Sequence, residues 1–114
     1  MEPAAAWNVG SVRDFAFDKD GSTWVGTKGK GLFRFDAHDR ITNISKEQGL
    51  CGDQIMSLAF DGDDNLWVAT LDGGVCVRKN GKFQPLSSDA KDGLSRALAL
   101  ARGLDGKMWV GSLF

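Results

Sequence analysis

The feature that most constrains this chain is a short phrase centred on tryptophan, which occurs three times. It reads DKDGSTWVGTKGKGLFRFD, then DGDDNLWVATLDGGVCVRK, and finally GLDGKMWVGSLF at the C-terminal end of the sequence. The tryptophans are Trp24, Trp67 and Trp109, at spacings of 43 and 42 residues. A period of roughly 40–45 residues is typical of β-propeller blades and of some helical repeats. The chain is therefore expected to repeat one supersecondary unit, and the pattern of apolar residues decides which.

The segments that precede each tryptophan phrase alternate with a period of two residues. VRDFAFD, IMSLAFD and ALALAR each place small residues on one face and large apolar residues on the other. This is the period of a strand, and two largely apolar faces predict a strand that is covered on both sides. Residues 97–101 are good helix formers, but they align with 12–16 and 55–59. A strand is therefore predicted there too.

Glycine-rich turns complete each unit. DKDGS and LDGK contain Asp-Gly, a strong hairpin signal, and in DGDDN the same place holds Asp64 and Asn65, which tolerate a positive φ. A short strand with the tryptophan, a second glycine turn, an apolar third strand (LFRF or VCVR) and a polar fourth strand (ITNIS or KFQPL) follow. Each unit is predicted to be a four-stranded antiparallel meander with an apolar inner and a polar outer strand, as in a propeller blade.

We therefore predict an all-β fold, a partial β-propeller of about two and a half four-stranded antiparallel blades. Its parts are an N-terminal lead-in (1–11), blade 1 (12–54), blade 2 (55–96) and the first half of blade 3 (97–114). A closed ring needs at least about four blades, so one strand edge and one apolar blade face are expected to lie open. We expect these surfaces to drive self-association; the alternative is a stretch of a longer sensor that is marginally stable alone.

These motifs resemble the two-component regulator propeller repeat. VGTKGKGLFRFD, VATLDGGVCVRK and the D-x-D-G-x-x-W lead-in carry the resemblance, whereas WD and kelch repeats require other patterns. Asp64 and Ala69 in the second unit and Gly103 and Ser112 in the third depart from the repeat. The resemblance implies the periplasmic sensor region of hybrid histidine kinases, with a saccharide or a partner domain as ligand.

Composition and rare residues exclude several functions. The net charge of −1 gives no basic surplus for nucleic acid, no apolar run is long enough to insert into a membrane, and the first residues do not read as a secretory signal. The compartment is therefore left open, except that the resemblance implies the periplasm. Cys51 and Cys76 form no CxxC motif. We expect two free thiols, with Cys76 buried as a small hydrophobe, and no metal or cofactor.

Catalytic residues are not expected. The single histidine, His38, lies in the polar turn DAHDR, whereas nucleophilic catalysis needs a base beside a Ser or Cys. The acidic turn around Asp61 and Asp63 lacks the glycine and glutamate of an EF-hand loop, so a plain hairpin turn is preferred over a calcium site. The chain is therefore predicted not to be an enzyme.

The candidate ligand-binding surface follows from the meander, because alternate connections lie at the same end of a blade. The turn after each tryptophan strand and the Gly-Leu linker into the next unit should share one face, where loops on a rigid scaffold commonly bind ligands. The candidate residues are Lys28, Lys30, Asp53, Gln54, Asp72 and Arg96. Solubilising loop residues are the alternative. The three tryptophans are interpreted as inter-blade packing residues, with an aromatic sugar platform as the alternative.

Together these features predict a non-enzymatic ligand-binding, sensing or protein-interaction module. The alternative is a structural or orphan propeller fragment whose main interaction is with itself.

Overall fold

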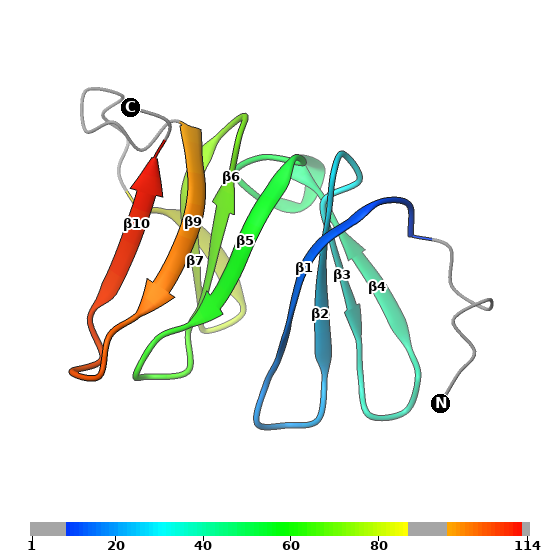
Figure 1. Ribbon diagram of the computed structural model, residues 1–114. Coiled ribbons are helices and arrows are strands. Elements are labelled where there is room, and N and C mark those ends of the chain that lie inside the picture. The colour runs from blue at the N-terminus through cyan, green and yellow to red at the C-terminus, as the bar shows by residue number, and fades with distance from the viewer. Residues whose placement is uncertain (1–8, 87–95, 113–114) are drawn as a thin grey trace.

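Three antiparallel sheets stand side by side in the computed structural model (Figure 1), which describes residues 9–86 and 96–112. The first sheet holds β1 (Val12–Phe17), β2 (Thr23–Thr27), β3 (Leu32–Phe35) and β4 (Ile41–Ile44), in that order. The second holds β5 (Ile55–Phe60), β6 (Leu66–Thr70), β7 (Gly74–Lys79) and β8 (Lys82–Pro85), and the third pairs β9 (Ala97–Arg102) with β10 (Met108–Ser112). The predicted partial propeller of two and a half blades is confirmed, and residues 97–102 form a strand rather than a helix.

The sheets correspond to blades 1, 2 and 3. Their inner strands β1, β5 and β9 lie next to one another, and the outer strands fan away from them (Figure 1). The predicted domain limits stay a prediction, because they include residues 1–8, 87–95 and 113–114, which lie outside the described part of the chain.

The first hairpin turn of each blade places one residue in the left-handed region at the same position of the repeat. Gly21, Asp64 and Gly106 have φ values of 88°, 62° and 84°. Glycine adopts this conformation without steric cost, and Asp is one of the few other residues that tolerate it. The substitution of aspartate for glycine in the second unit therefore preserves the turn.

A short 3₁₀ helix, η2 (Lys46–Gln48), precedes blade 2 and was not predicted. Ser45 and Gln48 form a capping box around it, and Gly49 ends it at a φ of 101°. The sequence SKEQ carries the S-x-x-Q signature of such a start, so this element could have been found. The helix directs Leu50 into the core, where its side chain is buried.

The main hydrophobic core lies between blades 1 and 2. Its buried members are Trp24, Leu32, Leu50, Ile55, Leu58, Leu66, Val68 and Cys76. A smaller cluster between blades 2 and 3 holds Ala69, Val75 and Ala97, with Trp67, Leu100 and Val110 packed against it. Both clusters join one blade to the next, so burial at the blade interfaces contributes much of the stability.

Side-chain size is matched across the two interfaces. A Cβ added to Gly26 would overlap the side chain of Ile55, the first residue of the next blade. At the equivalent place in the second interface, Ala69 and Ala97 lie in one buried cluster. The alanine that replaces a repeat glycine at position 69 therefore faces a partner smaller than isoleucine, and this explains the departure from the pattern.

Polar contacts also connect the inner strands. The backbone N–H of Leu58 donates to Oδ2 of Asp14 at 2.8 Å, and the N–H of Leu100 donates to Oγ of Ser57 at 3.1 Å. Asp14 and Ser57 occupy the same position in successive repeats. Blades 1 and 2 thus each offer one side-chain acceptor to the inner strand of the following blade, a role that the alternation pattern did not reveal.

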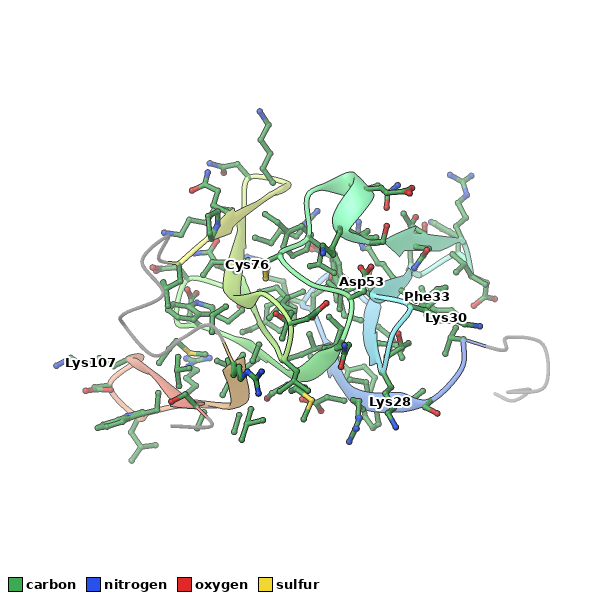
Figure 2. All side chains as sticks on the ribbon, turned by 90° about the horizontal axis from the view of Figure 1, so that it is seen from above. Lys28, Lys30, Phe33, Asp53, Cys76 and Lys107 are labelled. Atoms are coloured by element: carbon green, nitrogen blue, oxygen red, sulfur yellow. A yellow bond between two sulfur atoms is a disulfide. The ribbon has the colours of Figure 1, made fainter. Side chains whose placement is uncertain are left out.

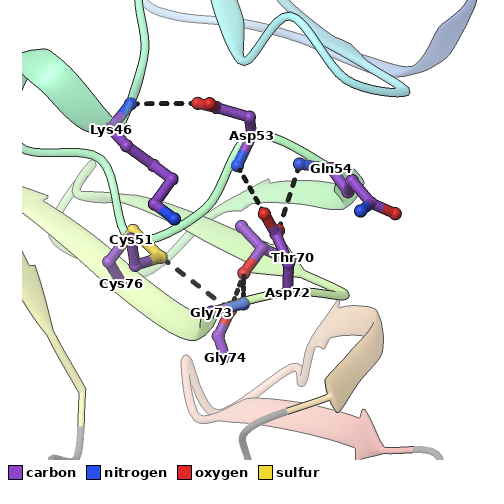
Figure 3. The surroundings of a disulfide bond; sticks show 9 residues. All are labelled: Lys46, Cys51, Asp53, Gln54, Thr70, Asp72, Gly73, Gly74 and Cys76. Carbon is purple, nitrogen blue, oxygen red and sulfur yellow. Dashed lines mark hydrogen bonds between the residues drawn. A yellow bond between two sulfur atoms is a disulfide. The ribbon is translucent and has the colours of Figure 1, made fainter.

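The prediction of two free thiols is wrong, because Cys51 and Cys76 form a disulfide (Figure 3). Their Cα atoms are 5.9 Å apart, within the usual range for a disulfide, and the bond closes a 25-residue separation. Cys76 is buried in the core, as expected. The linker after Leu50 crosses β7 and brings Cys51 to it, an approach that neither spacing nor composition encodes.

Candidate functional site

The surface named here the loop face comprises the β2–β3 turn, the linker from η2 to β5, the β6–β7 turn and the start of β9. These segments lie at one end of the strands (Figure 1), and Figure 2 looks down on that end. Backbone hydrogen bonds fasten the segments together: Gly31 N–H donates to the carbonyl of Asp53 at 3.1 Å, and Leu71 N–H donates to that of Gln54 at 2.9 Å. The loop face is therefore a hydrogen-bonded surface rather than a set of separate loops.

Two of the candidate residues hold this surface in place. The carboxylate of Asp72 accepts hydrogen bonds from the backbone N–H groups of Asp53 and Gln54, at 3.2 and 3.1 Å (Figure 3). Oδ1 of Asp53 accepts one from the N–H of Lys46 at 2.9 Å. Both carboxylates thus accept from backbone donors: Asp72 fixes the linker against the β6–β7 turn, and Asp53 fixes it against η2.

The other candidates present free ends to solvent. Lys28, Lys30, Gln54 and Arg96 are exposed, and none of the ion pairs found among the described residues involves them. Three of the four carry a positive charge. The loop face therefore combines a fixed acidic framework with exposed cationic side chains.

The three tryptophans differ in exposure and in the hydrogen-bond partner of the indole N–H. Trp24 is only 1% exposed, in the core between blades 1 and 2. Its indole N–H donates to Oδ2 of Asp18 at 3.0 Å, and Trp67 donates in the same way to Asp61 at 2.8 Å. Trp109 is 69% exposed, and the repeat places Gly103 where the other units have the aspartate.

These hydrogen bonds affect the pKa of the Asp18 and Asp61 carboxyl groups. Partial burial alone raises the pKa of each carboxyl, but the indole N–H and the backbone N–H groups of the turn outweigh it, so the pKa values of Asp18 and Asp61 are lowered. Oδ1 of Asp61 accepts from the N–H groups of Asp63 and Asn65. This turn is therefore internally hydrogen-bonded, as the hairpin interpretation predicts.

Two arginines flank Trp24, and the sequence reasoning missed both. The guanidinium carbons of Arg34 and Arg78 lie 5.2 and 5.0 Å from the centre of the indole. Arg34 is the cross-strand partner of Trp24 in the β2–β3 register, so the meander could have indicated it. Arg78 comes from blade 2, and only the packing of the two blades brings it to Trp24.

The end faces of the array expose apolar side chains whose repeat equivalents are buried. On β1, Phe15 and Phe17 are 56% and 67% exposed. The equivalent residues of blade 2 are Leu58, which is buried in the core, and Phe60, which packs against it. We call the Phe15–Phe17 surface the leading face. The surface around Trp109, equivalent to the buried surface around Trp24, is the trailing face.

The remaining polar groups of interest are the histidine and the potential metal ligands. His38 is exposed in a turn, where its backbone N–H donates to Oδ1 of Asp36. Within residues 9–86 and 96–112, no three His, Cys, Asp or Glu residues gather as a metal site would require. Nor does any helix in this part of the chain have the length and apolar character to cross a membrane.

The family described as "Two component regulator propeller" matches residues 49–72, from the end of the linker helix to the β6–β7 turn. The resemblance to this repeat is thereby confirmed. No curated protein matches the chain at a significant level.

Solved structures match over most of the chain. The extracellular domain of a hybrid two component system of B. thetaiotaomicron aligns with 97% of it, at a TM-score of 0.79 and 23% identity. A second such domain from the same organism aligns with 87%, at a TM-score of 0.72 and 24% identity. Virginiamycin B lyase from Staphylococcus aureus aligns with 90%, at a TM-score of 0.67 and 13% identity.

These likenesses establish the propeller fold. The chain spans only 15% and 14% of the two B. thetaiotaomicron domains, and 35% of the lyase. Because the same architecture occurs in extracellular domains of two component systems and in a lyase, the fold does not determine the activity.

Proposed function

We propose that the chain is a non-enzymatic sensing and interaction module of the two-component sensor propeller type, whose two end faces bind further blades. The observation that carries the proposal is the contrast between equivalent residues. Trp24 is buried between blades 1 and 2, whereas Trp109 is exposed, and Phe15 and Phe17 are exposed although their blade 2 counterparts are packed. Exposed apolar surface of this kind marks an interaction site.

The leading and trailing faces are complementary because they are the two halves of an interface that already exists within the chain. A second copy that placed its β1 against the Trp109 surface would repeat the packing of blade 2 on blade 1. The contact would be heterologous, so copies would associate head to tail. Blades of the same repeat in another polypeptide would cover the same two faces.

Light scattering after size-exclusion chromatography tests the association over a range of concentrations. The wild-type mass should rise with concentration, and Phe17→Lys should shift that rise to at least tenfold higher concentration because a charge cannot be buried on the leading face. Ile41→Lys is the matched control, since Ile41 is an exposed apolar residue of the outer strand β4. A monomer at every concentration, or an equal effect of the two variants, would contradict the proposal.

We infer that the module works outside the cytoplasm. Disulfides persist in oxidising compartments and are rare in the cytosol, and the Cys51–Cys76 bond is one that such a compartment maintains. The B. thetaiotaomicron neighbours are extracellular domains, which supports the same location. Alkylation before and after reduction, on protein from its natural host, should label the cysteines only after reduction. Labelling of the unreduced native protein would overturn the inference.

A saccharide or a partner domain is the proposed ligand of the loop face, with Lys28, Lys30 and Arg96 as the contacting side chains. Asp53 and Asp72 would hold the loops rather than contact the ligand. A thermal-shift screen against a saccharide panel should find a ligand whose effect is lost in the Lys28→Ser/Lys30→Ser variant. Lys107→Ser, in the β9–β10 turn at the other end of the strands, should retain the effect. A shift unchanged in both variants would remove the ligand from the loop face.

A further inference from the structure

A hollow of about 440 Å³ opens between the outer strands of blades 1 and 2, away from the loop-face candidates and both end faces. Its lining residues are Trp24, Arg34, Thr42, Ile44, Gln48, Gly49, Arg78, Gly81, Lys82 and Phe83. Three of these side chains are cationic and none is acidic. Its size falls within the range of small-molecule sites, roughly 300–1,000 Å³.

The positive charge in this groove is poorly compensated. Nη2 of Arg34 lies 3.9 Å from Oδ2 of Asp18, and its Nε donates to Oγ of Ser22 at 3.2 Å. The carboxylate of Asp18 is already occupied, because it accepts from the indole of Trp24 and from two backbone N–H groups. One engaged carboxylate therefore serves two guanidinium groups.

Arg78 is the less satisfied of the two arginines. Among the described residues, its guanidinium makes no hydrogen bond or ion pair, and it rests on the face of Trp24. Burial, and then repulsion from Arg34, lowers the pKa of Arg78, while Asp18 only partly opposes this. Arginine nevertheless stays protonated in proteins. The groove thus holds a charged, five-donor group without an acceptor.

Neutral groups around the arginines complete a binding surface. Oε1 of Gln48 accepts from the backbone N–H of Ser45 at 2.8 Å, which leaves the amide NH₂ as the free donor end of this side chain. The hydroxyl of Thr42 is a further polar group, and Ile44 and Phe83 add apolar surface. The guanidinium of Arg78 is positioned over the indole of Trp24, and the planar donors of a guanidinium fit an oxyanion in a bidentate manner.

From this geometry we propose that the groove between blades 1 and 2 binds a small oxyanion, a carboxylate or sulfate group, with Arg78 as the principal contact and Arg34 and Lys82 beside it. A second hollow that Trp24 also lines provides a contrast. Its lining shares Arg34 and Arg78 with the groove but sets three carboxylates, those of Asp18, Asp20 and Asp64, against four basic side chains, so its positive excess is one charge where that of the groove is three. The anion is therefore assigned to the acid-free groove.

Titrations of the full chain at low ionic strength, followed by NMR of the indole N–H and arginine Nε–H groups, test the site. The probes are sodium sulfate, sodium glucuronate and, as the neutral counterpart of glucuronate, glucose. Both anions should cause saturable shifts at Trp24 and Arg78, and glucose should not. If glucuronate binds more tightly than sulfate, the sugar ring that carries the carboxylate also contributes to binding. If the two bind equally, the anionic group alone accounts for the affinity. No saturation by either anion, or equal shifts with glucose, would overturn the proposal.

Variants of single charges separate a specific site from general electrostatics. Arg78→Met should weaken anion binding at least tenfold, and Lys82→Met, which leaves the stacking on Trp24 intact, about threefold. Arg40→Met is the matched control, because Arg40 is exposed in the β3–β4 turn and does not line the groove, and it should bind as the wild type does. If Arg40→Met weakens binding as much as Lys82→Met, the attraction is diffuse and the site is refuted.

Discussion

The fit between blades 1 and 2 depends on the absence of a side chain at Gly26. A methyl group added there would overlap Cγ2 of Ile55 and lie 3.0 Å from its Cβ. Gly26 does not have a positive φ, so its backbone could accept alanine, and the loss of glycine flexibility in the unfolded chain would by itself stabilise the protein by roughly 0.4–1 kcal/mol. Crowding against Ile55 is the opposing effect.

The sizes of these two effects decide whether Gly26→Ala stabilises or destabilises the protein. Extra carbon in a packed core costs about 1–3 kcal/mol, so Gly26→Ala should destabilise the protein by about 1–2 kcal/mol net. Ile55 is fully buried, and Ile55→Ala should cost about 2–5 kcal/mol through the cavity that it leaves. In the double variant the new methyl enters that cavity, which reproduces the alanine pair found between blades 2 and 3. The double variant should therefore cost less than the sum of the two single changes, by about 1–2 kcal/mol.

Urea unfolding monitored by tryptophan fluorescence measures these free energies of unfolding, provided that the m values stay equal. Gly111→Ala is the control: it is the equivalent position in blade 3, where a new Cβ would lie 3.6 Å from that of Ala99, an ordinary contact. It should show only the gain from the unfolded chain, a stabilisation of roughly 0.4–1 kcal/mol. Wild-type stability of Gly26→Ala, or strict additivity in the double variant, would refute the account of the blade interface.

Three further changes test separate contacts. Reduction of the Cys51–Cys76 bond, which spans 25 residues, should lower the free energy of unfolding by about 3.5 kcal/mol on the chain-entropy estimate, and an unchanged urea midpoint would show that it does not restrain the chain. Asp61 has a folded-state pKa below its ordinary value of 3.8, so its stabilisation is present above that value and lost as the pH falls through the folded-state pKa. Asp61→Asn should therefore flatten the acid side of a profile of melting temperature against pH. A profile as steep as that of the wild type would show that this carboxyl does not contribute to acid unfolding. Asp14→Ala removes an acceptor from the N–H of Leu58 and should cost about 1 kcal/mol in urea unfolding, while no change would mean that water replaces the carboxylate.

Local patterns predicted the parts of the fold that local physics determines. The two-residue alternation and the spacing of the tryptophans identified the strands, including β9, whose residues favour a helix when taken alone. Asp64 was expected to accept a positive φ and does so. The geometry found for one unit could be applied to the next, because each blade packs against its neighbour through residues at the same repeat positions.

Contacts between blades were not predictable in this way. The disulfide depends on the path of the linker over β7, and Arg78 reaches Trp24 only when two blades pack. Asp53 and Asp72 were correctly assigned to connections at one end of the blades, but the sequence could not show that backbone donors occupy their carboxylates. Such partners lie far apart along the chain, where neither periodicity nor turn chemistry carries information.

Hydroxyl-radical footprinting with mass spectrometry tests most directly whether the end faces are blade interfaces without a partner. At low concentration, Trp109, Phe15 and Phe17 should be oxidised readily, and Trp24 should be protected, because the exposed fractions of these side chains differ so widely. As the concentration rises, oxidation of Trp109 and of both phenylalanines should fall together, while Trp24 stays protected throughout. Oxidation of the three exposed residues that does not change with concentration would contradict the account.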